Sequence, residues 1–342
     1  MENKNNTTEI LQTKILMNTQ FENINLLQIA KEKILILTDT KVYTLHKAKF
    51  ENYLVIQIPE GEQHKTQTTV DDVVQQMLQL NIDKTYTLIA VGGGVVTDLG
   101  GYVASIYKRG IPLGLVPTTI LGMTDAAIGG KNGVNVGLYK NMVGTIYRPS
   151  FILYDFSFLY SLPKIQWING FTEIIKHACI KDKTMFEELS TKNVNFYLNN
   201  TASLISLVEK NVAIKMEIVA ADEFEKADRY LLNFGHTFGH AIENKYSLPH
   251  GFAVSIGMVI ASSISEKVCG LPTEVKFKIE ALLKQYELPT FLENINIPEV
   301  LALLQKDKKR EADAINFVLL KNIGDAITKK ITFLELAQLQ SA

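Results

Sequence analysis

The sequence is poor in several features that define special classes of protein. Its 342 residues include two cysteines, Cys179 and Cys269, which are too few for a disulfide framework. Lysine and arginine together number 35 against 36 aspartates and glutamates, and this balance, without a basic stripe, gives no indication of a nucleic-acid partner. The first residues are polar and contain no apolar signal core, and the longest nearly apolar stretch, residues 252–264, is too short to cross a bilayer. We therefore expect a cytoplasmic protein with no membrane or nucleic-acid partner.

The length and the apolar content of the chain indicate two domains. At 342 residues it exceeds the usual size of one hydrophobic core, and 46% of its residues are hydrophobic. Up to about residue 163, short apolar runs alternate with segments of helical periodicity. Such alternation is typical of an α/β fold, in which helices cover both faces of a parallel sheet. The predicted strands are residues 33–38, 54–58, 86–91, 113–116 and 151–154, and a predicted helix covers 66–80.

After residue 163 the pattern becomes mainly helical. We therefore predict an α/β domain over residues 1–163 and a mainly helical domain over residues 164–342, with no long linker between them. The predicted helices of the second domain are residues 172–181, 202–220, 234–245, 253–269 and 273–285, and one late strand covers 316–321.

Three glycines, Gly92, Gly93 and Gly94, follow a predicted strand and open a helix. Without side chains, phosphate oxygens can approach the backbone amides, and a helix N-terminus favours negative charge. The spacing differs from the usual G-x-G-x-x-G, so a tight strand-to-helix turn that requires glycines with positive φ is the alternative. Asp39, at the end of the first predicted strand, is placed to accept hydrogen bonds from ribose hydroxyls, although an N-cap role in the following helix would explain it equally well.

A second glycine-rich segment, residues 129–135, carries Lys131. Its glycines predict a bent loop, and an ammonium group on such a loop suits a phosphate or carboxylate ligand. The alternative is a surface turn with an incidental lysine.

Three of the six histidines lie within fifteen residues. His236 and His240 are four residues apart, so they share one face of a helix, and His250 follows the helix-breaking Pro249. Imidazole is a common metal ligand and a common general base. This stretch therefore indicates a metal-dependent active site, although a histidine pair at helical spacing also occurs by chance.

Glu173 and Lys176 lie three residues apart on an otherwise apolar predicted helix. They could form an exposed ion pair of little energetic weight or, given their apolar neighbours, a partly buried pair. With two histidines, Glu173 would complete a His₂Glu set that leaves one metal coordination position open for substrate.

Together these segments resemble the family of 3-dehydroquinate synthases, which belong to the sugar-phosphate cyclases. The resemblance runs from about residue 33 to residue 326, and its motifs occur in the family's order and at family-like spacing. The strongest motifs are residues 59–65, 92–98, 107–110, 117–119, 129–131, 140–142, 173–176 and 229–243.

The resemblance implies a fold and an activity. The implied fold is an N-terminal Rossmann-like, parallel-sheet NAD-binding domain followed by a mainly helical metal-binding domain. The implied reaction converts 3-deoxy-D-arabino-heptulosonate 7-phosphate to 3-dehydroquinate and phosphate, in the shikimate pathway of aromatic amino-acid biosynthesis. Transient oxidation by NAD, β-elimination of phosphate, re-reduction and intramolecular aldol closure make the enzyme a phosphorus–oxygen lyase. The family also implies a homodimer.

The resemblance further implies the residues of the site. The implied ligands of a divalent metal, zinc or cobalt, are Glu173, His236 and His250. The implied catalytic residues are Lys131, Lys176, Glu225 and His240. The implied NAD contacts are Asp39, Glu62, Lys65, Gly93, Gly94, Val95, Asp98, Thr118, Thr119 and Lys140. The implied substrate contacts are Arg109, Asp125, Lys131, Asn141, Lys176, Lys215, Arg229, Asn233, His240 and Lys309, the last chosen over Lys308.

Four positions depart from the family pattern, among them His177, which stands where an aromatic tyrosine is frequent. Phe252 stands where family members usually carry glutamate, two residues after the last implied metal ligand, so another group must orient His250. Thr97 replaces a common glycine in the phosphate turn, and Asn132 replaces a common threonine. The alternatives are therefore a related cyclase, such as 2-deoxy-scyllo-inosose synthase, and an NAD- and metal-dependent polyol dehydrogenase.

Overall fold

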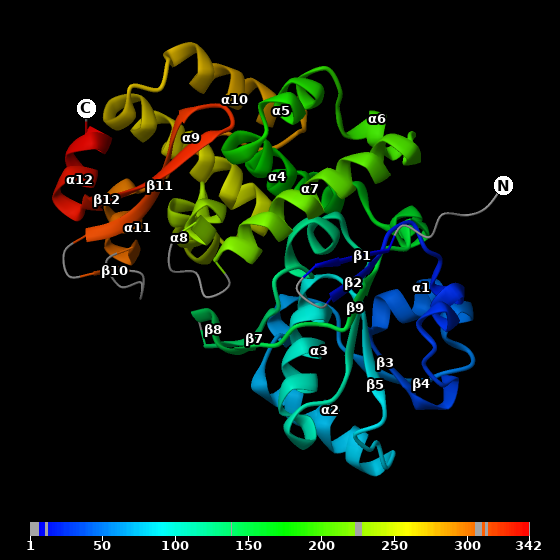
Figure 1. Cartoon of the computed structure of the whole chain (residues 1–342). Helices are drawn as coiled ribbons and strands as arrows, with labels where there is room; N and C mark the ends of the chain where they lie inside the picture. Colours follow the sequence, from blue (N-terminus) through cyan, green and yellow to red (C-terminus); the bar gives the residue numbers. More distant parts are fainter. Residues whose placement is uncertain are drawn as a thin grey trace. The chain divides into compact units, whose positions relative to one another are not determined.

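The computed structural model of the chain (Figure 1) describes residues 7–10, 13–137, 139–222, 228–304, 310–311 and 314–341. The chain forms two compact units, Met1–Gln166 with Ile205–Met216, and Trp167–Leu204 with Glu217–Ala342. Part of helix α7 (Thr201–Ala221) thus belongs to the first unit, although its neighbours in sequence belong to the second. The predicted domain boundary at residue 163 stays a prediction.

The first unit is built on one twisted sheet whose strand order, among the described residues, is β1-β2-β9-β6-β5-β3-β4. All neighbouring strands are parallel except β1, which pairs antiparallel with β2 at one edge. This confirms the predicted parallel α/β domain. The strands are β1 (Thr7–Ile10), β2 (Thr13–Leu16), β3 (Ile34–Asp39), β4 (Leu54–Ile58), β5 (Thr87–Gly92), β6 (Leu113–Pro117) and β9 (Phe151–Leu153).

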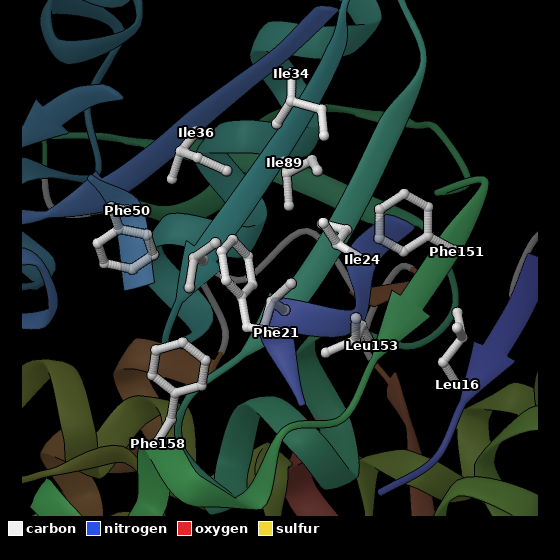
Figure 2. Packing of buried hydrophobic residues seen from close by; sticks show 12 residues of the cluster. Leu16, Phe21, Ile24, Ile34, Ile36, Phe50, Ile89, Phe151, Leu153 and Phe158 are labelled. Atoms are coloured by element: carbon white, nitrogen blue, oxygen red, sulfur yellow. The ribbon is translucent and has the colours of Figure 1, made fainter. Parts of the chain in front are cut away.

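Each face of this sheet is covered by a different set of elements. On one face, Phe50 from α1 (Thr40–Phe50) and Phe21 from the 3-10 helix Phe21–Leu27 pack over Ile36 and its neighbours (Figure 2). The Phe21 and Phe50 rings meet edge to face, with centroids 5.6 Å apart. The other face carries α2 (Gln67–Gln79) and α3 (Gly94–Ile106).

Four strands of the first unit were absent from the sequence prediction, namely β1, β2, β7 and β8. β7 (Lys131–Val136) and β8 (Tyr139–Ile146) form an antiparallel pair separate from the main sheet. The bent-loop prediction for Lys131 is therefore wrong, because Lys131 begins β7 directly after the left-handed residues Gly129 and Gly130. β7 and β8 have few apolar residues, so they lack the buried-strand pattern that revealed β3 and β5.

The second unit is mainly helical, as predicted. α9 runs through it and packs against α8, α10 and β11. Its helices are α4 (Lys164–Lys181), α5 (Lys183–Ser190), α6 (Val194–Leu198), α8 (His236–Tyr246), α9 (His250–Cys269), α10 (Thr273–Gln285), α11 (Ile297–Leu304) and α12 (Phe333–Ser341). A small antiparallel sheet has the order β10 (Arg310–Glu311), β11 (Ala314–Asn322) and β12 (Asp325–Thr332).

α9 is also the one helix among the described residues whose length and apolar composition would allow it to cross a membrane. More than half of its apolar window is buried inside the protein, and buried core helices of soluble proteins pass the same test.

Asp155 ties three segments of the first unit together. Its carboxylate is 2% exposed and accepts hydrogen bonds from the Phe21 amide at 2.9 Å, the Ser157 amide at 2.9 Å and the Lys49 ammonium at 3.1 Å. Burial alone raises the pKa of Asp155, but these donors together hold it below its ordinary value. The carboxylate thus fixes Phe21 over the aromatic core and anchors the end of α1.

We expect Asp155→Ala to lower the free energy of unfolding by about 2–4 kcal/mol, because three donors lose a buried charged acceptor. Since the folded pKa lies below the unfolded one, this contribution is complete above about pH 4 and is lost as the pH falls through the folded value. Urea unfolding at several pH values measures it. Glu187→Ala, which removes an exposed partner of Lys183, is the control and should change little. A pH-independent difference between Asp155→Ala and the unchanged protein would contradict the argument.

Candidate active site

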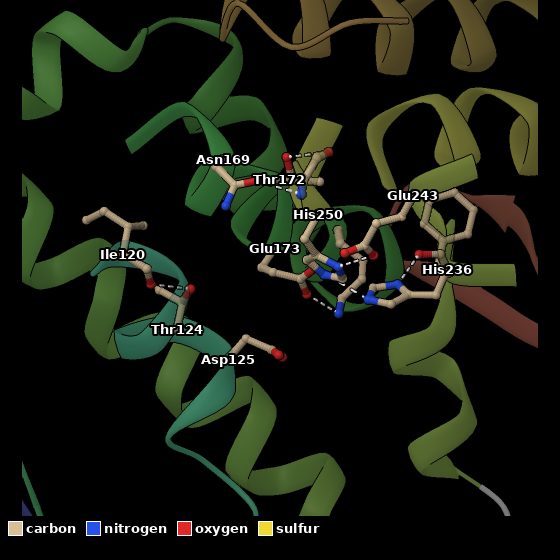
Figure 3. A network of polar contacts seen from close by, with 12 residues as sticks. Ile120, Thr124, Asp125, Asn169, Thr172, Glu173, His236, Glu243 and His250 are labelled. Carbon is tan, nitrogen blue, oxygen red and sulfur yellow. Dashed lines mark hydrogen bonds and ion pairs between the residues drawn. The ribbon is translucent and has the colours of Figure 1, made fainter. Parts of the chain in front are cut away.

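Three helices of the second unit bring Glu173, His236 and His250 together (Figure 3). One ligand atom from each residue lies within 4.8 Å of the others. Glu173 Oε1 is 3.5 Å from His236 Nε2 and 3.5 Å from His250 Nε2. Glu173 comes from the middle of α4, His236 from the first residue of α8 and His250 from the first residue of α9. The structure thus groups the three residues that the resemblance implied as metal ligands.

The donor atoms of this group fit a divalent cation. Within the described part of the chain, the buried Glu173 Oε1 has no hydrogen-bond partner, and a buried polar atom is costly to leave in that state. His236 Nδ1 lies 3.2 Å from the Phe234 carbonyl oxygen, and His250 Nδ1 lies 3.0 Å from Glu243 Oε2. Both imidazoles therefore direct Nε2 toward Glu173, and two imidazoles with one carboxylate form a set typical of Zn²⁺.

The three helices approach so closely because α9 carries glycine at its contacts. A Cβ on Gly251 would lie 2.2 Å from the Asn169 carbonyl oxygen on α4, and a Cβ on Gly257 would lie 2.0 Å from the Gly235 carbonyl oxygen at the start of α8. The Gly251 amide also donates to Asn169 Oδ1 at 2.7 Å, and the Thr172 hydroxyl donates to the Gly251 carbonyl at 3.0 Å (Figure 3). Two hydrogen bonds between α4 side chains and the Gly251 backbone therefore set the position of His250 relative to Glu173.

Lys176 supplies the compensating charge for Glu173. Both side chains are almost completely buried, and the Lys176 ammonium donates to Glu173 Oε2. The exposed ion pair considered from the sequence is therefore wrong. Burial alone raises the pKa of Glu173, but Lys176 and the two imidazoles hold it well below its ordinary value. The carboxylate is thus kept ionised, as a metal ligand must be.

The pKa values of His236 and His250 are shifted in opposite directions. Burial, aided by the Lys176 ammonium, lowers the pKa of His236 to about 3. Burial alone would also lower the pKa of His250, but the Glu173 and Glu243 carboxylates beside its two ring nitrogens raise it to about 10. A cation bound to this group would take the place of the proton on His250.

His240 lies beside this group but not within it. Its ring centroid is 5.2 Å from that of His236 and 6.0 Å from that of His250. A second set of close ligand atoms joins His240 with Glu243 and His250. The i,i+4 spacing thus placed His236 and His240 on one face of α8, but only His236 faces Glu173.

Two further polar residues of the second unit precede α8. Arg229 and Asn233 lie in the 3-10 helix Asp228–Asn233, and Arg229 is 3% exposed. Its amide donates to Asp222 Oδ2 at 3.2 Å. Glu225 and Lys309, which the resemblance also implied, lie outside the described residues.

In the first unit, Asp39 and the glycine turn lie at neighbouring strand ends. β3 pairs with β4 on one side and with β5 on the other, so the chain order reverses there. Ligands of open parallel sheets bind at such a switch point, beyond the carboxyl ends of the strands. Asp39 ends β3, and Gly93 and Gly94 follow β5. Asp39 Oδ1 accepts from the Val42 amide at 2.8 Å, so the N-cap role is observed.

The glycine turn starts α3 without side chains at Gly93 and Gly94. Gly93 caps the N-terminus of α3 without a side chain, and a Cβ there would lie 3.1 Å from the Thr119 methyl group. A Cβ on Gly94 would lie 3.3 Å from Ala126. Both glycines have negative φ, so the alternative of a turn that requires positive φ is wrong for them. The residues present fit a dinucleotide phosphate at a helix N-terminus.

A polar network adjoins this turn. The buried Lys65 ammonium contacts Asp98 Oδ2 and Asn141 Oδ1, each at 2.5 Å. Burial raises the pKa of Asp98, and the Lys65 ammonium acts in the opposite direction. The Asn135 amide group donates to Glu62 Oε1 at 2.8 Å and its oxygen accepts from the Asn141 amide at 3.0 Å. Lys65 thus joins Asp98 to Asn141, and Asn135 joins Asn141 to Glu62. The sequence prediction gave Asn135 no role.

The remaining implied residues of the first unit fall into two groups. Lys215 of α7 and Asp125 pair at 2.6 Å, and the Thr124 hydroxyl donates to the Ile120 carbonyl in the turn that carries Asp125 (Figure 3). The residues of the second group lie outside both the metal group and the polar network around Lys65. Arg109 and Lys131 are exposed, Val95 lies in the first turn of α3, Thr118 and Thr119 directly follow β6, and Lys140 lies in β8.

Comparison with known proteins decides the family. Residues 55–169 match the 3-dehydroquinate synthase N-terminal family, and residues 170–310 match the 3-dehydroquinate synthase C-terminal family. The chain belongs to the 3-dehydroquinate synthase family. It is 38% identical over 309 residues to the 3-dehydroquinate synthase of Campylobacter concisus (strain 13826), covering 87% of this chain and 88% of that protein.

Solved structures give the same fold. A 2-epi-5-epi-valiolone synthase from Streptomyces hygroscopicus subsp. jinggangensis 5008, with NAD⁺ and Zn²⁺ bound, matches with a TM-score of 0.88 and 27% identity, covering 96% of each chain. A 2-deoxy-scyllo-inosose synthase complexed with carbaglucose-6-phosphate, NAD⁺ and Co²⁺ matches with a TM-score of 0.85 and 23% identity, covering 97% of this chain and 98% of that one. The second likeness shows the fold alone.

We expect Gly257→Ala to destabilise the protein by about 1–3 kcal/mol, because the added methyl overpacks the contact between α9 and α8. In an uncrowded helix the same change would stabilise by about 1 kcal/mol, so the sign of the effect tests the contact. Thermal and urea unfolding measure it. Ser263→Ala on the same helix is the control and should have little effect. A stabilised Gly257→Ala protein would contradict the close approach.

Proposed function

We propose that the chain is a 3-dehydroquinate synthase that converts 3-deoxy-D-arabino-heptulosonate 7-phosphate to 3-dehydroquinate and phosphate. The convergence of Glu173, His236 and His250, with Lys176 beside them, carries this proposal. Family membership over both halves of the chain supports it. The proposed order of events is transient oxidation of a ring alcohol, loss of phosphate by β-elimination, re-reduction, ring opening and intramolecular aldol closure.

NAD is the proposed redox cofactor, and when bound it accepts a hydride and returns it within one turnover. Gly93, Gly94 and Val95 would approach its phosphates, as the side-chain-free N-cap of α3 allows. Asp39 keeps one carboxylate oxygen in the α1 cap, which leaves its other oxygen for a ribose hydroxyl. The other proposed contacts are Glu62, Lys65, Asp98, Thr118, Thr119 and Lys140.

Glu173, His236 and His250 would hold a divalent metal, zinc or cobalt. When bound, the metal polarises the alcohol and then the carbonyl oxygen of the substrate. Three protein ligands leave a coordination position for that oxygen. Lys176 keeps Glu173 ionised by donating a hydrogen bond to its Oε2. An ammonium group has three N–H donors, so Lys176 would also contact the substrate.

The proposed substrate carries a carboxylate and a phosphate, so cations should bind it. Arg229 would bind the carboxylate in bidentate fashion, and Arg109, Lys131 and Lys215 would bind further oxygens. Asp125, Asn141, Asn233, His240 and Lys309 complete the proposed substrate contacts. For proton transfer we propose His240 and Glu225, with Lys131 and Lys176 also catalytic, because imidazole and carboxylate groups exchange protons near neutral pH.

The alternatives predict different products. The neighbour complexed with carbaglucose-6-phosphate keeps a sugar 6-phosphate as a candidate substrate class, but the 38% identity to a 3-dehydroquinate synthase favours the heptulosonate. A polyol dehydrogenase needs only the oxidation step and would accumulate NADH. A cytoplasmic homodimer that binds no nucleic acid or membrane stays part of the proposal.

With NAD⁺ and Zn²⁺ or Co²⁺, the purified protein should release phosphate from 3-deoxy-D-arabino-heptulosonate 7-phosphate without net NADH, because the hydride returns to the product. A colorimetric phosphate assay and absorbance at the NADH wavelength measure the two quantities. Chelator-treated protein should be inactive and recover on metal addition. Steady NADH formation, or phosphate release from glucose 6-phosphate alone, would overturn the assignment.

His236→Ala should lose bound metal, whereas His240→Ala should keep it and lose activity by roughly 10²–10⁴-fold, the usual contribution of a proton-transfer group. The two residues lie on the same face of one helix, so they serve as controls for each other. Metal analysis after dialysis and turnover assays measure the difference. Equal loss of metal in both variants would show that their roles are not divided in this way.

A further inference from the structure

We propose that Glu243 is a positioning residue that orients the His250 imidazole for metal binding. This inference rests on the proposed metal site and gives a role to Glu243, which ends the 229–243 motif but received no role from the motif or the resemblance. It also answers the question raised by Phe252, an apolar residue near His250 that cannot hydrogen-bond to it.

The geometry of the contact is direct. Glu243 Oε2 lies 3.0 Å from His250 Nδ1, and the Glu243 side chain is 7% exposed. Glu243 lies seven residues after His236, two helical turns along α8, so both residues project from the same face of that helix. α8 thus supplies one proposed ligand directly and the orienting partner of another (Figure 3).

The contact selects which nitrogen of His250 can bind a cation. A neutral imidazole has one N–H donor and one nitrogen lone pair. When Nδ1–H donates to the Glu243 carboxylate, the lone pair is on Nε2, which lies 3.5 Å from Glu173 Oε1. A carboxylate partner also fixes the ring plane and makes the ligand nitrogen more basic.

His236 provides an internal comparison. Its Nδ1 lies next to the Phe234 carbonyl oxygen, a backbone group that no substitution removes. His250 relies on a side chain for the same purpose, so its orientation can be changed by mutation without altering a ligand.

A different role for Glu243 is as a ligand itself, since its carboxylate, His240 and His250 also lie within 4.8 Å of one another. The two groups compete for His250, because Nδ1 cannot both donate to Glu243 and bind a cation. Glu173 Oε1, buried and without a hydrogen-bond partner among the described residues, favours the group with Glu173.

The test compares Glu243→Ala and Glu243→Gln with the unchanged protein. Co²⁺ is titrated into metal-free protein in competition with a chelator, and the visible absorption of bound Co²⁺ reports the ligand geometry. Circular dichroism and thermal unfolding of the metal-free variants verify that they fold. Glu266→Ala is the matched control, because it removes an ion-paired carboxylate from α9, the helix of His250, at a different place.

We expect Glu243→Ala to bind Co²⁺ about 10–100-fold more weakly, the usual loss for such a partner, with an altered absorption spectrum. Glu243→Gln should lose less, because its amide oxygen still accepts the Nδ1–H hydrogen bond without the charge. Glu266→Ala should bind as the unchanged protein does.

Wild-type affinity and spectrum in Glu243→Ala would overturn the proposal. If Glu243→Ala does not fold, the same result in Glu243→Gln would overturn it. Retention of Co²⁺ by His236→Ala but not by Glu243→Gln would identify Glu243 as a ligand and also overturn the positioning role. An unchanged protein that binds no Co²⁺ would instead overturn the proposed metal site itself, so the two failures are distinguishable.

Discussion

The second unit depends on the close approach of α9 to α4 and α8. Gly251 and Gly257 allow this approach, since a Cβ at either position would lie within 2.2 Å of a carbonyl oxygen of a neighbouring helix. A glycine inside a helix lowers its intrinsic stability by up to about 1 kcal/mol relative to alanine. Here the cost is offset by packing that brings side chains from three helices within reach of one cation. The metal group is therefore a property of helix packing and not of any one helix.

The same packing makes burial of charge unavoidable. Glu173 is fully buried, so an uncompensated carboxylate there would be strongly destabilising. Lys176 one turn away donates to Glu173 Oε2, and His250, 3.5 Å from Glu173 Oε1, contributes positive charge that Glu243 balances in turn. Without a cation this network leaves Glu173 Oε1 without a hydrogen bond among the described residues. A divalent ion would satisfy that oxygen and return His250 to the neutral form that ligands require.

The sequence predicted what depends on local periodicity. The buried strands β3, β5 and β6 and the helices α9 and α10 were predicted within a few residues, because apolar spacing and glycine or proline boundaries are local signals. β7, β8 and β12 were not predicted, because strands with few apolar residues lack that signal. β11 was predicted only for residues 316–321. Spacing alone grouped His236 with His240, whereas the structure groups His236 with Glu173 and His250. Only the family resemblance named this set from the sequence, because Glu173 lies far from both histidines in the chain.

Asn135 and Glu243 show why such partners escape sequence reasoning. Neither is a metal ligand in the predicted set, and each acts by holding another polar residue in place. Asn141 has a left-handed backbone with φ of 56°, which is uncommon outside glycine, and the Asn135 side chain accepts the hydrogen bond of its amide. Asn141 and His250 each have an expected role, and each depends on a hydrogen-bond partner, Asn135 or Glu243, to which the sequence prediction gave no role. Such partners are found from hydrogen-bond geometry. Substituting one of them should change the orientation of the residue that it holds, and the affinity of that residue for its ligand, without removing any residue that binds the ligand directly.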